Sequence, residues 1–140
     1  MTMIATLPAG QPMPVWAGGA RQQRGRAAYH TGLAAEESVA RDYGRRGRTV
    51  AARRWRGLSG EIDLVVRDGE GFVFVEVKQA RTFDLAAERL SRRQMDRICL
   101  AAQEFVGTQP RGSLTDMRFD LALVDGQGRV QVIENAFWES

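Results

Sequence analysis

One lysine stands among the 20 basic residues of the chain, and the other 19 are arginines. This residue, Lys78, ends the apolar run Phe72–Lys78, in which Glu76 precedes it by two positions. Arginine stays protonated and spreads its charge over a planar fork, whereas a lysine ammonium is compact and can lose its proton when it is desolvated. Such an amine can orient or deprotonate a water molecule beside a metal ion held by carboxylates. The arginine bias therefore makes Lys78 a candidate for chemistry.

The segment before Lys78 offers a second carboxylate, Asp63. Both Glu61–Val66 and Phe72–Lys78 alternate with period two, and the Asp-Gly pair between them predicts a β-hairpin. Because side chains alternate along a strand, Glu76 and Lys78 should share one face with the phenylalanines of the run. The same alternation on the first strand puts acidic and apolar side chains on opposite faces: Glu61 and Asp63 on one, Ile62, Leu64 and Val66 on the other.

If the hairpin register places Asp63 beside Glu76, two carboxylates and an amine converge at a strand end. Carboxylate oxygens are hard ligands, and together with substrate phosphates they form sites for Mg²⁺. Apolar neighbours make such charges costly to bury unless a metal or a partner charge compensates for them. The alternative is a solvated ion pair between Glu76 and Lys78 with no further role, because surface ion pairs are common and weak.

The composition is that of an ordinary globular protein. The chain has 140 residues, of which 44% are hydrophobic and 26% charged, enough for one domain with a core. Its single cysteine, Cys99, excludes an internal disulfide and a cysteine-based zinc cluster, and is expected to be a small buried residue. No stretch approaches ~20 apolar residues, and the first residues lack the features of a secretory signal. We expect a cytoplasmic protein without membrane association.

The net charge of +3 is unevenly distributed. Residues 1–60 carry ten arginines against three acidic residues, a balance of +7, whereas residues 61–140 carry ten basic and fourteen acidic residues, a balance of −4. A basic half favours a polyanionic partner such as nucleic acid. Solvated arginine-rich faces are the alternative.

The remaining pattern predicts one domain over residues 31–140 behind a disordered, basic N-terminal arm, residues 1–30, which is rich in Pro, Gly, Gln and Ala. We expect helices over 32–46 and, behind a Ser-x-x-Gln capping box, from Ser91 to about Val106. Strands are expected over 49–56, 118–124 and 130–133, besides the hairpin, whose apolar second strand should be covered on both faces. The order αβββαββ predicts an α/β fold with a mixed β-sheet flanked by helices.

Asp63 followed by Glu76-Val-Lys78 matches the PD-(D/E)XK nuclease signature. More specifically, Gly60–Val65 with Val75–Lys78 resembles the YraN-type family of small bacterial proteins, which are similar in fold to Holliday junction resolvases. The resemblance extends over residues 32–138 and includes further matching segments: Gly32 with Glu36, Arg118–Asp120, and Glu134–Phe137. It implies a restriction-endonuclease-like core.

The resemblance also implies roles for individual residues. Asp63 and Glu76 would hold a divalent ion, Mg²⁺ or Mn²⁺, with the backbone carbonyl of Val77 as a further ligand. Lys78 would orient or deprotonate the attacking water and stabilise charge on the phosphate. Glu36 would reach the site from the first helix as a further ligand or a base. Glu61 also matches the family motif. A role in a structural ion pair is an equally suitable interpretation of this residue.

Four arginines are candidate nucleic-acid contacts. Arg53, Arg54 and Arg56 lie on the strand expected over 49–56, where they would track a phosphate backbone without reading its sequence. Arg81 corresponds, through the resemblance, to a phosphate-facing residue that follows the lysine. Trp55, among these arginines, is suited equally to stacking on a base and to packing in the core.

These observations lead to the hypothesis of a metal-dependent endonuclease that hydrolyses phosphodiester bonds in DNA. Cleavage directed by DNA structure, such as a branch, is expected because the sequence contains no helix-turn-helix or zinc module. One alternative is a catalytically silent nucleic-acid-binding accessory protein in DNA processing, and another is a structural protein with an incidental ion pair. Resolvases of this fold work as dimers because a junction is two-fold symmetric, so a homodimer is the corresponding assembly.

Overall fold

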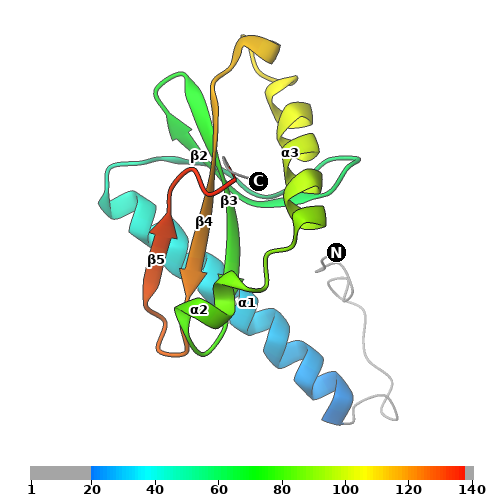
Figure 1. Cartoon of the computed structure of the whole chain (residues 1–140), viewed down its shortest axis with the longest axis vertical. Coiled ribbons are helices and arrows are strands. Elements are labelled where there is room, and N and C mark those ends of the chain that lie inside the picture. The colour runs from blue at the N-terminus through cyan, green and yellow to red at the C-terminus, as the bar shows by residue number, and fades with distance from the viewer. Residues whose placement is uncertain (1–19, 138–140) are drawn as a thin grey trace, which may run out of the picture.

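A five-stranded sheet forms the centre of the computed structural model, which describes residues 20–137 (Figure 1). The strands lie side by side in chain order: β1 (Val50–Arg56), β2 (Glu61–Asp68), β3 (Gly71–Gln79), β4 (Met117–Val124) and β5 (Val130–Ile133). β3 and β4 pair in parallel, and the other neighbours pair antiparallel. This mixed sheet confirms the predicted fold class and is compatible with a restriction-endonuclease-like core.

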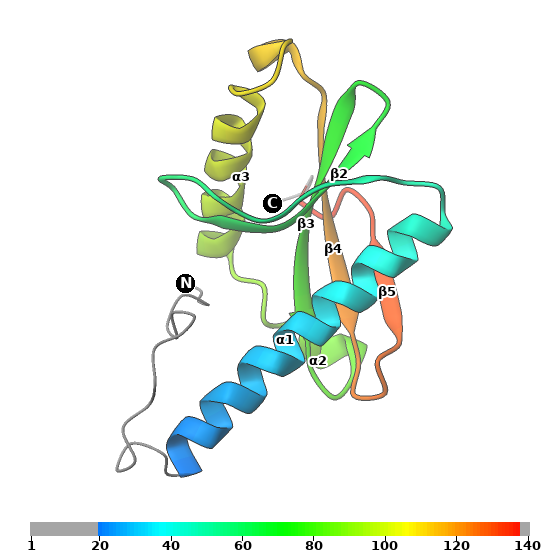
Figure 2. The same ribbon diagram turned by 180° about the vertical axis from the view of Figure 1, so that it is seen from behind.

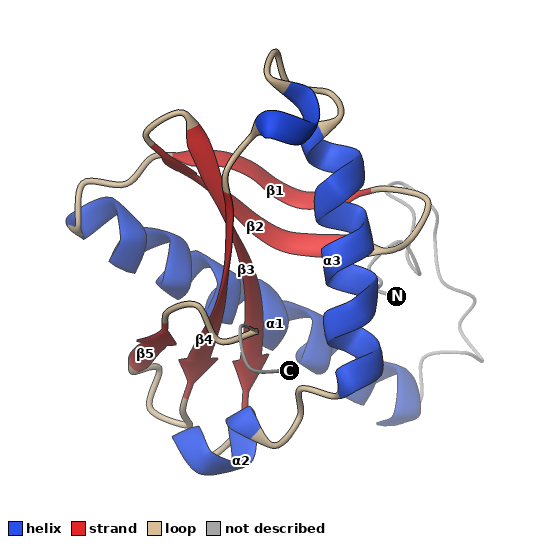
Figure 3. Cartoon of the chain, turned by 45° about the horizontal axis from the view of Figure 1, so that its top comes forward, coloured by secondary structure: helices blue, strands red, loops and turns tan. Residues whose placement is uncertain are grey.

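Helices cover both faces of the sheet (Figure 3). Helix α1 (Ala20–Arg45) packs on one face and α3 (Arg92–Val106) on the other. The short α2 (Phe83–Ala87) contacts β3 and β4, and a 3-10 turn, η3 (Gly112–Leu114), follows α3. The predicted order of helices and strands is confirmed, with α2 as an additional turn of helix on the crossover from β3 to its parallel neighbour β4.

The hairpin of β2 and β3 has the predicted turn. Asp68 pairs with Gly71, and of the two residues between them Gly69 adopts a φ of 61°. This left-handed conformation favours glycine, which has no Cβ to clash with the backbone. Residues 71–75 of β3 are buried, as expected for a strand covered on both faces.

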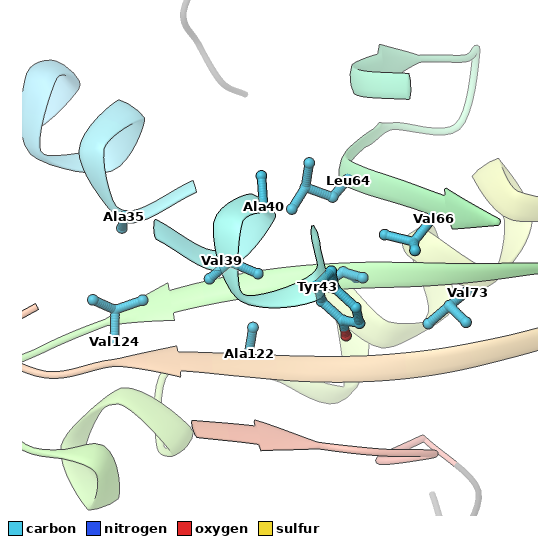
Figure 4. Close-up of a cluster of buried hydrophobic side chains, with 10 residues drawn as sticks. Ala35, Val39, Ala40, Tyr43, Leu64, Val66, Val73, Ala122 and Val124 are labelled. Atoms are coloured by element: carbon cyan, nitrogen blue, oxygen red, sulfur yellow. The ribbon is translucent and has the colours of Figure 1, made fainter. Parts of the chain in front are cut away.

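The α1 face of the sheet holds one apolar cluster (Figure 4). Ala35, Val39 and Tyr43 recur at every fourth residue along α1, are buried and point onto the sheet. The side chains that they meet come from three strands: Leu64, Val66, Val73, Val75, Ala122 and Val124. Their burial fixes how α1 lies across the strands.

The α3 face is built around Phe105. Its ring makes edge-to-face contacts with Trp55, Phe72 and Phe74 at centroid distances of 5.3, 5.1 and 5.7 Å. Of the two roles open to Trp55, the structure therefore shows core packing. The predicted capping box at the start of α3 is confirmed. Cys99, on the same helix, is only partly buried, so the expectation of a fully buried residue was wrong.

Helix α1 begins at Ala20, earlier than the expected start near Gly32. Residues 20–30, which were expected in the arm, belong to this helix, because Ala, Arg and Gln favour helix and extend the turns anchored on the sheet. These N-terminal turns reach past the sheet (Figure 2). Residues 1–19 of the predicted arm lie outside the described residues. No helix within 20–137 has the length and apolar composition needed to cross a membrane.

One face assignment on β2 was wrong. Ile62 was expected beside Leu64, yet it packs in the α3 cluster while Leu64 packs in the α1 cluster. Opposite this position on β1, Arg54 stands between the paired residues Arg53 and Trp55 and has a φ of 50°. Such a φ is uncommon at a residue other than glycine, so β1 departs from regular strand geometry beside this part of β2.

A buried carboxylate links the helix, the sheet and the C-terminal segment. Asp120 on β4 accepts hydrogen bonds from the Tyr43 hydroxyl at 2.7 Å, from both ends of the Arg118 guanidinium, and from the backbone N–H of Asn135 at 3.0 Å. Burial and the charge of Asp120 raise the pKa of Tyr43 above its usual range, so its hydroxyl stays a donor. Segments of the resemblance that are distant in sequence thus form one structural network.

Candidate metal and nucleic-acid site

The two strands that carry the candidate residues separate at Asp63. The ladder between β2 and β3 ends with the pair Leu64 and Val75. Beyond it, β1 and β2 turn away from β3 (Figure 3). In the gap, the Asp63 carboxylate accepts the backbone N–H of Val77 at 2.8 Å, a donor that the ladder leaves free. The separation creates room at the strand ends, and one carboxylate is fixed at its edge.

Glu76 and Lys78 lie on the same face of β3, as the alternation predicts. The Lys78 Nζ is 3.1 Å from Glu76 Oε2, and these side chains are 15% and 12% exposed. Together with Asp63 they line a pocket of about 450 Å³, which we call the carboxylate pocket. Its other walls come from the β1–β2 loop, β2 and α3: Ser59, Gly60, Glu61, Gln94, Arg97 and Ile98.

Burial raises the pKa of the Asp63 carboxyl well above its ordinary value, and the negative charge of Glu76 raises it further. Burial also raises the pKa of Glu76, although the Lys78 ammonium opposes this. Two negative charges are therefore unfavourable in this buried position without a compensating positive charge. Lys78 supplies one positive charge, and a divalent cation would supply the remainder.

Glu36 approaches the acidic pair from α1. Its Oε1 accepts a hydrogen bond from Arg54 Nε at 2.7 Å, and the two side chains are 17% and 20% exposed. Burial raises the pKa of Glu36 to about 7, the bond from Arg54 opposes the rise, and the charge of Asp63 adds to it. Glu36 therefore lies close enough to Asp63 for their charges to interact.

The donor set suits a hard divalent ion. Among residues 32–137, whose side chains the structure describes, no group of three or more His, Cys, Asp or Glu side chains is arranged to hold a metal by itself. Mg²⁺ commonly takes one or two protein carboxylates and completes its shell with water and substrate phosphates. Asp63 and Glu76 meet that requirement, and the carbonyl of Val77 stays the predicted third protein ligand.

The predicted nucleic-acid contacts on β1 are engaged with acidic partners. Arg53 donates to Glu37 at 2.8 Å, Arg54 donates to Glu36, and Arg56 lies 3.8 Å from Glu61. The last pair agrees with the structural reading of Glu61. Arg81 is exposed on the loop after β3 and lines a second pocket. Phosphate contact by the four arginines stays a prediction.

Sequence reasoning missed the contribution of α3 and of the β1–β2 loop. Gln94, Arg97 and Ile98 line the carboxylate pocket, and their spacing of three and four residues, which puts side chains on one helix face, was the available signal. The loop is held by Glu104, whose carboxylate accepts the backbone N–H groups of Leu58 and Ser59 at 2.6 and 2.9 Å.

The fold and site together define an α/β domain in which two carboxylates and a lysine meet where neighbouring strands of a mixed sheet separate. Residues 35–124 match the uncharacterised protein family UPF0102, also known as the YraN family, and the chain belongs to this family. The predicted YraN-type resemblance is thereby confirmed. The matched residues include all four candidate catalytic residues: Glu36, Asp63, Glu76 and Lys78.

Individual relatives resemble most of the chain. A UPF0102 protein of Cereibacter sphaeroides is 63% identical over 113 residues, covering 81% of this chain and 97% of its own. One of Ruegeria pomeroyi is 58% identical over 114 residues, covering 81% and 93%. One of Roseobacter denitrificans is 54% identical over 120 residues, covering 86% and 93%. Their names state the family and no activity.

Proposed function

We propose that this protein is a metal-dependent endonuclease that hydrolyses phosphodiester bonds in DNA and selects its substrate by structure, such as a branch. The observation that carries the proposal is the convergence of Asp63, Glu76 and Lys78 in an open pocket at the separation of β2 and β3. Two acids and an amine in such a pocket are the groups that metal-assisted hydrolysis of a phosphate requires.

In this proposal Asp63 and Glu76 hold Mg²⁺ or Mn²⁺, with the Val77 carbonyl beside them. When bound, the ion supplies positive charge to the phosphate and makes the attacking water more acidic. Lys78, held by Glu76, orients that water and stabilises the charge that develops on the phosphate oxygens. Glu36 faces the same group from α1, and Arg54 keeps its side chain in position.

A cleavage assay tests this proposal. Purified protein is incubated with branched and linear DNA in the presence of Mg²⁺, Mn²⁺ or EDTA. We expect the wild type to cleave DNA in Mg²⁺ or Mn²⁺ and not in EDTA. The substitutions Asp63→Asn and Glu76→Gln should each abolish this cleavage. Glu70→Gln is the control, because it removes an equal charge at an exposed site paired with Arg111. Absence of cleavage in the wild type, or equal cleavage by all variants, contradicts the proposal.

The alternative role, a catalytically silent DNA-binding accessory protein, predicts a different outcome in the same assay. DNA would be bound in a salt-sensitive manner, neither wild type nor variant would cut it, and Asp63→Asn would leave binding intact. A homodimer fits the proposed branched substrate through their shared two-fold symmetry, and sedimentation of protein with and without a DNA junction would detect it.

A further inference from the structure

Lys78 lines two pockets. One is the carboxylate pocket, and the other, which we call the arginine pocket, has a volume of about 560 Å³ beyond the end of β3. The arginine pocket is lined by residues of α1, of β3 with the segment that follows it, and of the β4–β5 turn: Gly32, Val77, Lys78, Gln79, Ala80, Arg81, Arg89 and Gly126. Three of these are basic and none is acidic, whereas the carboxylate pocket holds three acidic residues.

The arginines around these pockets differ from those on β1 in their partners. Within residues 20–137, no carboxylate forms an ion pair with Arg81, Arg89 or Arg97, and all three are exposed. Arg53 and Arg111 are also exposed to solvent, but their guanidinium groups are bonded to Glu37 and Glu70. In an arginine without an acidic partner, no carboxylate offsets the positive charge or occupies the N–H donors. Both can then bind a ligand such as phosphate.

The backbone that carries Arg81 is fixed by the β4–β5 turn. The N–H of Gly126 donates to the Arg81 carbonyl at 3.1 Å, and the N–H of Ala80 donates to the Val124 carbonyl at 3.1 Å. The buried Asp125 holds this turn by accepting the backbone N–H groups of Gln127 and Arg129. A basic side chain on an anchored segment is suited to hold a ligand in a defined place.

We propose that Arg81 and Arg89 bind the backbone phosphates on one side of the cleaved bond and that Arg97 binds those on the other side, so that the DNA strand crosses Lys78 from one pocket to the other. This assignment rests on the proposed nuclease function and adds its substrate path. It adds Arg89 and Arg97 to the predicted binding residues. A strand held on both sides is cut at internal bonds, so cleavage needs no free end.

DNA binding tests this path without cleavage. Affinity for a four-way DNA junction is measured in EDTA at several salt concentrations for Arg81→Gln, Arg89→Gln and Arg97→Gln. Arg111→Gln is the control, since it removes the same charge from an exposed residue that is ion-paired with Glu70 and lines neither pocket. Each test variant should bind roughly three- to tenfold more weakly and lower the slope of log affinity against log salt by about 1. The control should bind like the wild type.

A second pair of variants tests the arginine pocket by obstruction. Gly32 and Gly44 both lie on α1, and a Cβ added at either would meet no atom within 4 Å. They are separated by about 18 Å along the helix, and Gly32 alone of the two lines the pocket. Gly32→Glu should weaken junction binding, whereas Gly44→Glu, with the same charge change on the same helix, should not.

Several results would overturn the proposed path. They are unchanged affinity and salt slope in all three arginine variants, equal losses in the Arg111→Gln control, or equal effects of the two glycine variants. Failure of the nuclease function gives a different pattern, because the wild type would then bind DNA and cut none. Cleavage only of junctions with free arm ends, with a junction whose arms are sealed by hairpin loops left intact, would contradict the path across Lys78 while leaving metal-dependent hydrolysis in place.

Discussion

The Asp63 carboxylate accepts the backbone N–H of Val77 where the pairing of β2 with β3 has already ended. The bond joins the two strands through a side chain and holds that side chain beside Glu76. Separation of the strands and placement of the acid are therefore one structural feature. An asparagine at position 63 could accept the same hydrogen bond without the negative charge. The substitution Asp63→Asn therefore distinguishes the hydrogen bond to Val77 from binding of a metal by the carboxylate.

Asp63→Asn should leave the metal-free protein at least as stable as the wild type, because it removes a charge whose burial is unfavourable. It should abolish stabilisation by Mn²⁺, which for the wild type amounts to about 2.7 kcal/mol at a metal concentration 100 times the Kd. Thermal unfolding with and without Mn²⁺ measures both effects. An equal rise in Tm for wild type and variant would refute metal binding by Asp63.

Ionisation of Glu36 should make the metal-free protein less stable as the pH rises from about 4.5 to 7. Glu36 has its folded pKa raised from 4.5 to about 7, so the folded state binds more protons than the unfolded state in this range. Its stabilising contribution is complete below the unfolded pKa and is lost as the pH passes the folded pKa. Glu36→Gln should flatten the dependence in urea unfolding with EDTA. An unchanged slope in the variant would contradict the shift.

Tyr43→Phe should destabilise the fold without affecting the metal site. The change removes one donor from the buried Asp120, which keeps its bonds to Arg118 and Asn135. A lost hydrogen bond to a buried charged acceptor costs about 1 to 3 kcal/mol. Urea unfolding measures the loss, and the Mn²⁺-induced rise in Tm should match that of the wild type. A stability equal to the wild type would show that the hydroxyl is dispensable.

Glu104→Ala should loosen the β1–β2 loop that borders the carboxylate pocket. The variant removes the carboxylate that accepts the N–H groups of Leu58 and Ser59. Hydrogen exchange at these two amides should become faster, whereas Gln103→Ala, at the neighbouring exposed position, should leave it unchanged. Equal exchange in both variants would mean that other contacts hold the loop.

Much of the fold was predictable because burial enforces a simple period. The hairpin and the interior strand β3 follow from alternating apolar residues, and α3 begins at a capping box that the sequence displays directly. The pairing of acid and amine, Glu76 with Lys78, follows from the same alternation. These features depend on residues close together in the chain.

Features that depend on distant residues were not predictable. Arg53 and Arg54 donate to Glu37 and Glu36 once α1 lies against β1. Ile62 and Leu64 lie in different apolar clusters although they are two residues apart, a departure from regular alternation that the sequence pattern does not show. The position of Arg97 in the wall of the carboxylate pocket depends on how α3 crosses β2 and β3. No local sequence pattern specifies that crossing.

The most direct test of the central claim is single-turnover cleavage of branched DNA by Lys78→Arg in saturating Mn²⁺. The substitution keeps a positive charge beside Glu76 and removes the compact amine. We predict a cleavage rate at least about 100-fold below that of the wild type, with Mn²⁺ still bound in calorimetry. Cleavage at the wild-type rate would contradict the assignment of Lys78 to the reaction.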